Sequence, residues 1–153
     1  MDKGEELRYL FLAAQREGNR TLKEALQPVG LTPAQAEVIM VLQQYETLTL
    51  IELGERLVCE NGSPSRLVNS MVKAGWVQKA RSAEDGRAVL LTLTEQAHDV
   101  LPELNQINTA YNQGVGDLLD DATMQVALDM LWKIVGETSS GKALQYRKSE
   151  LDT

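Results

Sequence analysis

The chain has 153 residues, 43% of them hydrophobic and 24% charged, which is the composition of a soluble domain with its own core. No window approaches the roughly 20 consecutive apolar residues of a membrane-spanning helix, and the acidic start MDKGEELRYL lacks the basic residues of a secretory signal, so we expect a cytoplasmic protein. Cys59 and His98 are the only cysteine and histidine, which excludes an internal disulfide and a zinc site of soft ligands; we expect no metal and no cofactor.

The formal net charge of -7 is unevenly distributed. Residues 1–60 carry a net charge of -4, residues 61–93 a net charge of +3, and residues 94–153 a net charge of -6. A positive segment between negative flanks is expected when one surface meets a polyanion while the rest of the protein repels non-specific contacts. Chance clustering of charges on a solvated face explains the charges alone equally well.

Two helices are predicted at the start of the chain. Residues 5–27 carry apolar residues at spacings of three and four, and Pro28 and Gly30 then end the helix. Thr32 offers a capping hydroxyl before a proline, with a glutamine three residues later, which predicts a helix over residues 33–45. The apolar residues of these two helices are Leu7, Leu10, Phe11, Ala14, Leu22, Leu26, Val38, Ile39 and Leu42.

The next two predicted helices form a helix-turn-helix. Thr49 and Glu52 repeat the capping pattern and predict a short helix that ends near residue 58, with Leu50, Leu53 and Leu57 on its inner face. In the following helix Ser63 is the cap, Pro64 the first residue and Gly75 the end. Leu67, Val68, Met71 and Val72 form its apolar face, and the opposite face, which has no acidic residue, comprises Ser65, Arg66, Asn69, Ser70 and Lys73.

A hairpin is predicted directly after Gly75. Residues 76–81 and 88–93 are short strand-like runs, and residues 83–86 between them have the composition of a turn. A helix-turn-helix followed by a hairpin is the winged form of this motif. The wing also carries positive charge, from Lys79, Arg81 and Arg87.

Two more helices are predicted in the last third of the chain. Thr94 caps a helix over residues 95–117, which Pro102 should bend or break, and Asp120 caps a helix over residues 121–137. The tail from Ser139 onward is polar and receives no assignment. The apolar face of the second helix comprises Met124, Ala127, Leu128, Leu131, Ile134 and Val135.

The predicted fold class is therefore mainly α (α+β): a winged helix-turn-helix with long flanking helices that form an intertwined dimer. The apolar faces of the flanking helices need a partner, and a symmetric dimer with an apolar interface supplies one. We expect one structural domain with three parts, which are an N-terminal dimerisation helix (1–30), a winged helix-turn-helix (31–94), and C-terminal dimerisation helices with a polar tail (95–153).

The sequence resembles the MarR (multiple antibiotic resistance regulator) family of bacterial winged helix repressors. The matching segments are LTPAQAEVIMVL (31–42), LTLIELGERL (48–57), SPSRLVNSMVKAGWV (63–77) and DGRAVLLTLTEQA (85–97). Asp85 and Arg87 occupy the two positions of the D-x-R signature at the wing tip. The chain departs from the common pattern at Gly86, where a second arginine is frequent, and at Ala80, where a basic residue is frequent.

The resemblance implies a homodimer that binds a pseudo-palindromic operator in double-stranded DNA, with the recognition helix in the major groove and the wing in the minor groove. It also implies a repressor that is released by a small effector, often an aromatic or phenolic anion, or by cysteine oxidation. The family places the effector between the winged domain and the dimer helices. Arg16 is a candidate for an anionic effector, although a solvated arginine is the more common case.

We expect nine residues to contact DNA or to shape the wing that does so. An arginine can read guanine, an asparagine can read adenine, and hydroxyls and amides at a helix N-terminus suit phosphates. Asp85 is expected to hold the Arg87 guanidinium by a charge-assisted hydrogen bond, and the alternative is a turn aspartate that bonds its own backbone. The nine residues are Ser63, Ser65, Arg66, Asn69, Lys73, Lys79, Arg81, Asp85 and Arg87.

Other functions are weaker interpretations. An enzyme lacks support, because no nucleophile lies near His98 in sequence and there is no Gly-rich phosphate loop or catalytic pair of acids. A winged helix module for protein contacts would not need the basic face. RNA recognition would need an exposed aromatic platform. A redox-sensing regulator acting through Cys59 is a further alternative, but neighbouring Glu60 favours an inert thiol.

Overall fold

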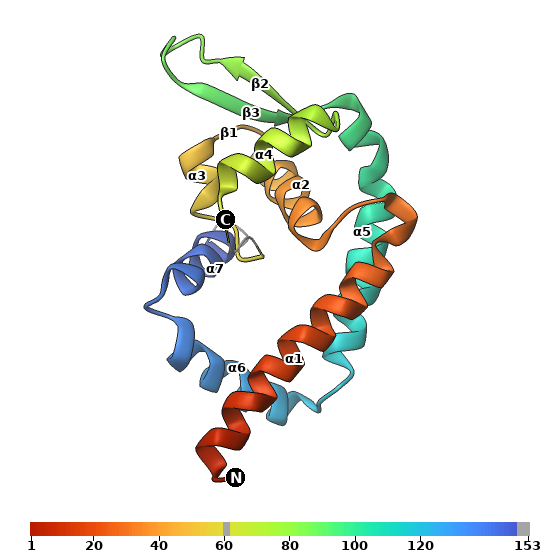
Figure 1. Cartoon of the computed structure of the whole chain (residues 1–153), viewed down its shortest axis with the longest axis vertical. Coiled ribbons are helices and arrows are strands. Elements are labelled where there is room, and N and C mark those ends of the chain that lie inside the picture. Colours follow the sequence, from red (N-terminus) through yellow and green to blue (C-terminus); the bar gives the residue numbers. More distant parts are fainter. Residues whose placement is uncertain (60–61, 150–153) are drawn as a thin grey trace.

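The structure is a computed structural model that describes residues 1–59 and 62–149 (Figure 1). The winged helix domain lies at one end, and α1 and α5 run side by side away from it toward α6. From α6 the chain returns to the winged domain through α7. The elements are α1 (Lys3–Ala25), η1 (Gln27–Val29), α2 (Pro33–Tyr45), β1 (Leu48–Thr49), α3 (Leu50–Gly54), α4 (Pro64–Lys73), β2 (Val77–Arg81), β3 (Val89–Leu93), α5 (Glu95–Gly116), α6 (Asp121–Val135) and α7 (Ser139–Ser149).

Local capping fixes where the helices of the winged domain begin. Thr32 Oγ1 accepts the Gln35 N–H at 3.2 Å while Gln35 Oε1 accepts the Thr32 N–H at 3.0 Å, as the capping box predicts. Thr49 and Glu52 form the same reciprocal pair at the start of α3. The backbone hydrogen bond from Thr49 lowers the pKa of Glu52, because it stabilises the charged carboxylate.

The core lies between α2, α3, α4, the small sheet and the first turns of α5. The antiparallel sheet has the strand order β1-β3-β2, and Val77 of β2 pairs with Leu93 of β3. β1 was not expected from the sequence. The largest fully buried side chains are Leu26, Ile39, Leu42, Leu53, Met71, Leu91, Leu104, Val38, Val41, Val68 and Val77.

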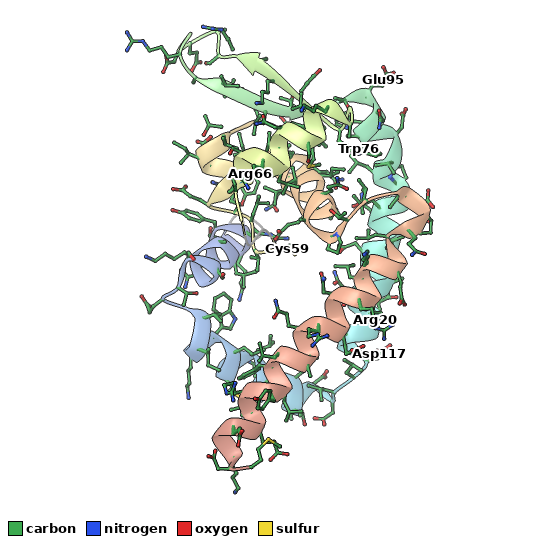
Figure 2. The ribbon with its side chains drawn as sticks, viewed as in Figure 1. Arg20, Cys59, Arg66, Trp76, Glu95 and Asp117 are labelled. Atoms are coloured by element: carbon green, nitrogen blue, oxygen red, sulfur yellow. The ribbon has the colours of Figure 1, made fainter. Side chains whose placement is uncertain are left out.

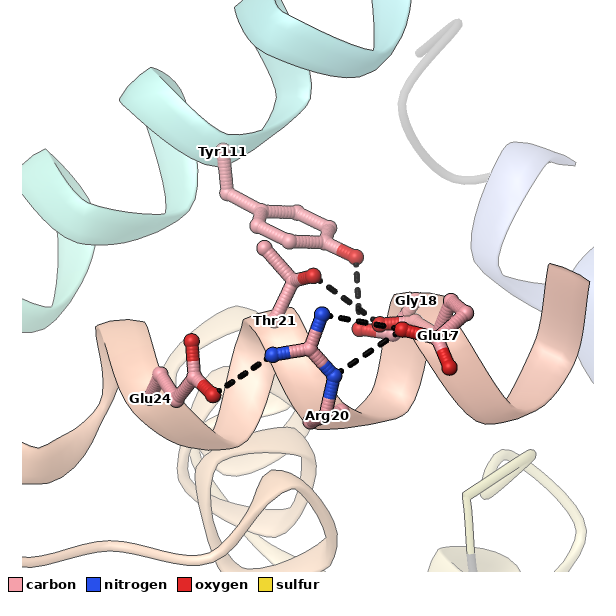
Figure 3. A network of polar contacts seen from close by, with 6 residues as sticks. All are labelled: Glu17, Gly18, Arg20, Thr21, Glu24 and Tyr111. Atoms are coloured by element: carbon pink, nitrogen blue, oxygen red, sulfur yellow. Dashed lines mark hydrogen bonds and ion pairs between the residues drawn. The ribbon is translucent and has the colours of Figure 1, made fainter.

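The flanking helices pack less completely than the winged domain. The Tyr111 hydroxyl of α5 donates a hydrogen bond to the Gly18 carbonyl of α1 at 2.9 Å, and this bond joins the two helices (Figure 3). On the same stretch of α1, Arg20 forms ion pairs with Glu17 and Glu24. No residue of α1 or α6 is buried, and the expected apolar faces of both helices are largely exposed in the single chain.

Three further expectations differ from the structure. α3, the first helix of the helix-turn-helix, ends at Gly54 rather than near residue 58. α5 continues through Pro102 as one helix, so of the expected bend or break the break does not occur. The tail without assignment forms α7, in which Gly141 and Ala143 are buried. Within the described residues, no helix is both long and apolar enough to cross a bilayer.

Candidate nucleic-acid interface

The polar face of α4 is exposed because the opposite face is anchored in the core. Val68 and Met71 are 1% and 0% exposed, which fixes the rotation of the helix about its axis. Arg66, Asn69 and Lys73 are exposed on the other side. Ser70 shares this face, but its hydroxyl donates to the Leu67 carbonyl at 2.7 Å.

The start of α4 is organised by two serines. Ser63 is the N-cap, and its Oγ accepts the Arg66 N–H at 3.4 Å. The hydroxyls of Ser63 and Ser65 lie 2.7 Å apart in a hydrogen bond, and both residues are half-buried. These hydroxyls therefore order the first turn of α4, where Pro64 has no N–H and the Arg66 and Leu67 N–H groups bond to Ser63.

Gly75 directs the chain from α4 into the wing. Its φ of +82° lies in the left-handed region, where a Cβ is strained, and the Trp76 N–H donates to the Met71 carbonyl at 2.9 Å. Thr94 Oγ1 donates to the Gly75 carbonyl at 2.6 Å, which ties the start of α5 to the same turn. The direction of the wing relative to α4 follows from these bonds.

The wing is a regular antiparallel hairpin with an ordered tip. Arg81 pairs with Val89 in register, and the Arg81 Nη1 donates to the Gly86 carbonyl at 3.1 Å. Asp85 Oδ1 accepts the backbone N–H of Arg87 at 3.0 Å. The expected bond between the Asp85 carboxylate and the Arg87 guanidinium is absent from the described residues, because the carboxylate instead bonds the backbone amide two residues further along the chain.

The wing and α4 contact each other through one polar pair. Lys79 Nζ on β2 donates to Asn69 Oδ1 on α4 at 2.7 Å. One lone pair of the Asn69 amide oxygen is therefore used by Lys79, and the second lone pair and the amide N–H groups remain for a base. Sequence reasoning placed both residues in the site but did not pair them.

Three of the expected cations have no protein partner in the described part of the chain. The side chains of Arg66, Lys73 and Arg87 are exposed and make no hydrogen bond or ion pair there. Arg66 lies on α4, as Figure 2 shows. Charges that are not neutralised within the protein are available for an external polyanion, and the α4 face and the wing belong to the same end of the molecule (Figure 1).

A cleft of about 500 Å³ lies between the flanking helices and the turn of the helix-turn-helix. Arg16 lines it, together with Tyr111 from α5 and Cys59 from the turn. Cys59 is exposed as a residue, but partial burial of its thiol and the nearby Glu37 carboxylate raise its pKa to about 11. The thiol is therefore protonated at neutral pH, which disfavours the redox-sensing interpretation.

The structure also reveals two polar residues that sequence reasoning missed. Glu37 on α2 is buried, and it forms an ion pair with Arg147 on α7. The signal for Glu37 was a single carboxylate inside the apolar stretch AQAEVIMVL. Arg147 had no comparable signal, because its partner is 110 residues away.

Comparison with known proteins identifies relatives of the winged domain and of the overall fold. Residues 31–97 match the family model described as a winged helix DNA-binding domain. The organic hydroperoxide resistance transcriptional regulator of Bacillus subtilis is 33% identical over 90 residues, which are 59% of this chain and 61% of that protein. The chain thus matches less than two thirds of that relative's length.

Two solved structures share the fold at lower identity. A mutant of MarR from E. coli, complexed with operator DNA, superposes with a TM-score of 0.76 at 24% identity, covering 88% of this chain and 99% of that one. An organohalide-sensing transcriptional regulator in its 2,4-dichlorophenol-bound form has a TM-score of 0.79 at 18% identity, covering 91% of this chain and 83% of that one.

Proposed function

We propose that the chain is a MarR-family winged helix transcriptional regulator, a cytoplasmic repressor that binds a specific double-stranded DNA operator as a homodimer. The match of residues 31–97 to a winged helix DNA-binding domain supports this proposal. The observation that carries this proposal is the set of cations on α4 and the wing that have no protein partner. Arg66, Lys73 and Arg87 are exposed without ion pairs in the described residues, inside a protein of net charge -7. Such charges stabilise a complex with phosphates.

In this proposal α4 enters the major groove and the wing reaches the minor groove. Arg66 reads a guanine, Lys73 contacts a phosphate, and Arg87 enters the minor groove, where a narrow A/T-rich stretch concentrates negative potential. Asn69 contributes through its amide N–H groups and the second lone pair of its oxygen, since Lys79 uses the other lone pair. Ser63, Ser65, Arg81 and Asp85 hold the shapes of the α4 start and the wing tip.

The dimer that we propose buries the exposed apolar faces of α1 and α6. Leu10 and Ile134 are 57% and 52% exposed, and water contact with so much apolar surface is unfavourable. A second copy offers the same faces, and a two-fold dimer would present two α4 helices to a pseudo-palindromic operator. Residues 1–30 and 95–153 would then serve dimerisation, and residues 31–94 would serve DNA binding.

We further propose that a small aromatic or phenolic effector binds the cleft beside Arg16 and releases the DNA. The cleft has the volume for such a molecule, and Arg16 offers a positive charge to a phenolate or carboxylate. The related regulator bound to 2,4-dichlorophenol supports this chemical class. The cleft joins α1 and α5 to the turn before α4, so a ligand there can favour one arrangement of the two parts.

The test is DNA binding by the purified protein, measured by fluorescence anisotropy at several salt concentrations. A duplex is first selected by the wild-type protein from a random-sequence pool. We expect Arg66→Ala, Lys73→Ala and Arg87→Ala each to weaken DNA binding. A variant that removes a phosphate contact, such as Lys73→Ala, should also reduce the salt dependence of the binding affinity. Lys23→Ala on α1 is the control with the same loss of charge. A wild-type protein that selects no duplex would instead favour the protein-contact module.

A further inference from the structure

Glu37 is a buried carboxylate that holds the turn of the helix-turn-helix. Its side chain is on α2 and is 8% exposed, and it is the one buried charged residue in the described chain. Its Oε1 and Oε2 accept the Val58 N–H at 2.9 and 3.1 Å, and Oε2 accepts the Cys59 N–H at 2.7 Å. These two amides lie shortly before Ser63, the cap of α4.

Arg147 supplies the charge that makes this burial possible. Its Nη1 lies 2.9 Å from Glu37 Oε1, and the pair joins α7 to α2 across 110 residues of sequence. The other ion pairs of the described residues, between Arg20 and its neighbours, lie within α1. Burial of a carboxylate without its cation is strongly destabilising. In the absence of Arg147, the Glu37 carboxylate would therefore become hydrated or turn toward the solvent.

Further contacts fix α7 in the position that delivers Arg147. The Tyr45 hydroxyl of α2 donates to the Tyr146 carbonyl at 3.2 Å. The Arg56 guanidinium, from the segment after α3, lies 4.6 Å from the Tyr45 ring centre and 5.1 Å from the Tyr146 ring centre. Arg56 is thus held between aromatic rings of α2 and α7, and cation–π attraction adds to the contact.

From these contacts we infer that α7 positions the recognition helix: Arg147, acting through Glu37, holds the Val58 and Cys59 amides in the turn that precedes α4. The inference rests on the proposed DNA-binding function, because it concerns how accurately α4 meets the bases. Arg147 is a positioning residue, since it lies on the inner side of the turn and not on the exposed face of α4. α7 follows α6, one of the flanking helices, and packs against the winged domain. It therefore links the proposed dimer region to the domain that carries α4 and the wing (Figure 1).

The positioning role makes a specific prediction about affinity. Base reading needs α4 in one orientation, whereas contacts with phosphates tolerate small rotations. Removing Arg147 therefore lowers affinity for the selected operator and leaves affinity for a scrambled duplex nearly unchanged. The ratio of the two affinities is the readout that a general loss of stability or charge would not move.

The experiment compares Arg147→Met with Lys148→Met in the full chain. Lys148 is the matched control, because it is the adjacent cation of α7 and lies 5.4 Å from the Trp132 ring centre, away from the turn. For Arg147→Met we expect about a tenfold loss of operator affinity, a change of less than twofold on the scrambled duplex, and an unchanged dimer in size-exclusion light scattering. Arg147→Lys, which keeps the charge, should restore part of the loss.

A double-mutant cycle with Glu37→Gln tests the path of the effect. If Arg147 acts through Glu37, Arg147→Met in the Glu37→Gln background causes little further loss of operator affinity. Without DNA, the amide proton resonances of Val58 and Cys59 should shift in Arg147→Met and stay in place in Lys148→Met. This NMR readout reports on the contact independently of DNA binding and also reveals a variant that fails to fold.

Several outcomes would overturn the inference. Equal operator affinity for the two methionine variants would do so, as would fully additive effects in the cycle or an equal loss on both duplexes. Unmoved Val58 and Cys59 resonances in Arg147→Met would also contradict it. A wild-type protein that binds no DNA overturns the proposed function and this role with it, whereas normal wild-type binding with an unaffected Arg147→Met overturns the positioning role alone.

Discussion

At the scale of single residues, Arg66 is the side chain from which we expect base recognition. It is exposed on α4 and has no partner among the described residues. Arg66→Ala should weaken binding to the selected operator by about 1–3 kcal/mol, the usual contribution of a two-bond contact with guanine. Ser70→Ala is the control on the same face, since the Ser70 hydroxyl already bonds the Leu67 carbonyl. Similar affinities for the two variants in fluorescence anisotropy would remove Arg66 from the base contacts.

Asp85 offers a test of how the wing tip is held. Its carboxylate bonds the Arg87 amide and not the guanidinium, and an asparagine oxygen can accept the same bond. Asp85→Asn should therefore bind the operator at least as tightly as wild type, because a negative charge near phosphate is also removed. Asp85→Ala should bind about 1 kcal/mol more weakly than Asp85→Asn. A loss in Asp85→Asn as large as in Asp85→Ala would restore the charge-assisted interpretation.

The thiol of Cys59 should react slowly at neutral pH. Burial and Glu37 raise its pKa to about 11, so only about one thiol in ten thousand is ionised at pH 7. The thiolate is the reactive form, and the rate of alkylation by iodoacetamide should therefore keep rising up to about pH 11. Glu37→Gln removes the negative charge and should move the profile to lower pH. A half-maximal rate near the value of a free thiol, about pH 8.5, would contradict the raised pKa.

At the scale of elements, Gly75 joins α4 to the wing through a backbone conformation that favours glycine. A Cβ at its φ of +82° would be strained and would lie 2.8 Å from Gln96 Oε1, a side chain that can move. Gly75→Ala should lower the free energy of unfolding by about 1–2 kcal/mol, measured by chemical denaturation. Gly86→Ala is the control, since no atom lies within 4 Å of its added Cβ and its φ is not in the left-handed region. Equal stability of the two variants would show that the turn tolerates a side chain.

The elements that were predicted well have signals within a few residues. Thr32, Ser63, Thr94 and Asp120 cap helices as predicted, because each cap bonds an amide three residues ahead. α3 ended earlier than predicted because of a distant residue. Glu37 takes the Val58 and Cys59 amides, which a longer helix would have used internally.

β1 and α7 were missed because tertiary contacts create them. β1 has two residues and exists because Leu48 pairs with Leu91 at the free edge of β3. α7 lacks a sustained apolar face, and it is held by Arg147 and by the close approach of Gly141 to the Val135 carbonyl. Neither signal can be read from a local window of sequence.

At the scale of the whole molecule, the apolar face of α6 should hold two copies together. Leu128 is 43% exposed in the single chain, and Leu128→Glu would place a charge in the proposed interface. We expect the variant to elute as a monomer in size-exclusion light scattering, at concentrations where wild type is a dimer. Ala122→Glu is the control, because Ala122 is exposed on the opposite side of α6 near its N-terminus. A monomeric wild type, or a dimeric Leu128→Glu, would contradict the proposed interface.

The exposed faces of α4 and the wing were easier to predict than the contacts that hold these elements in place. The α4 face follows from the helical spacing of apolar and polar residues, and the wing follows from two strand-like runs around a turn. The exposed cations of both could therefore be predicted from residues 63–93. The arrangement of Arg147, Glu37 and the turn depends on a contact across 110 residues, and the cleft beside Arg16 depends on three separate segments. Local sequence patterns carry no information about contacts between segments that are far apart in the chain.

In the function that we propose, the concentration of cations at one end of an otherwise acidic molecule also governs how the protein approaches DNA. Residues 61–93 carry a net charge of +3 between flanks of -4 and -6. In the field of a duplex such a molecule experiences a torque that turns α4 and the wing forward, while the acidic helices are pushed away. Encounters are thereby biased toward productive orientations, and a molecule that lands sideways departs quickly rather than occupying unrelated DNA.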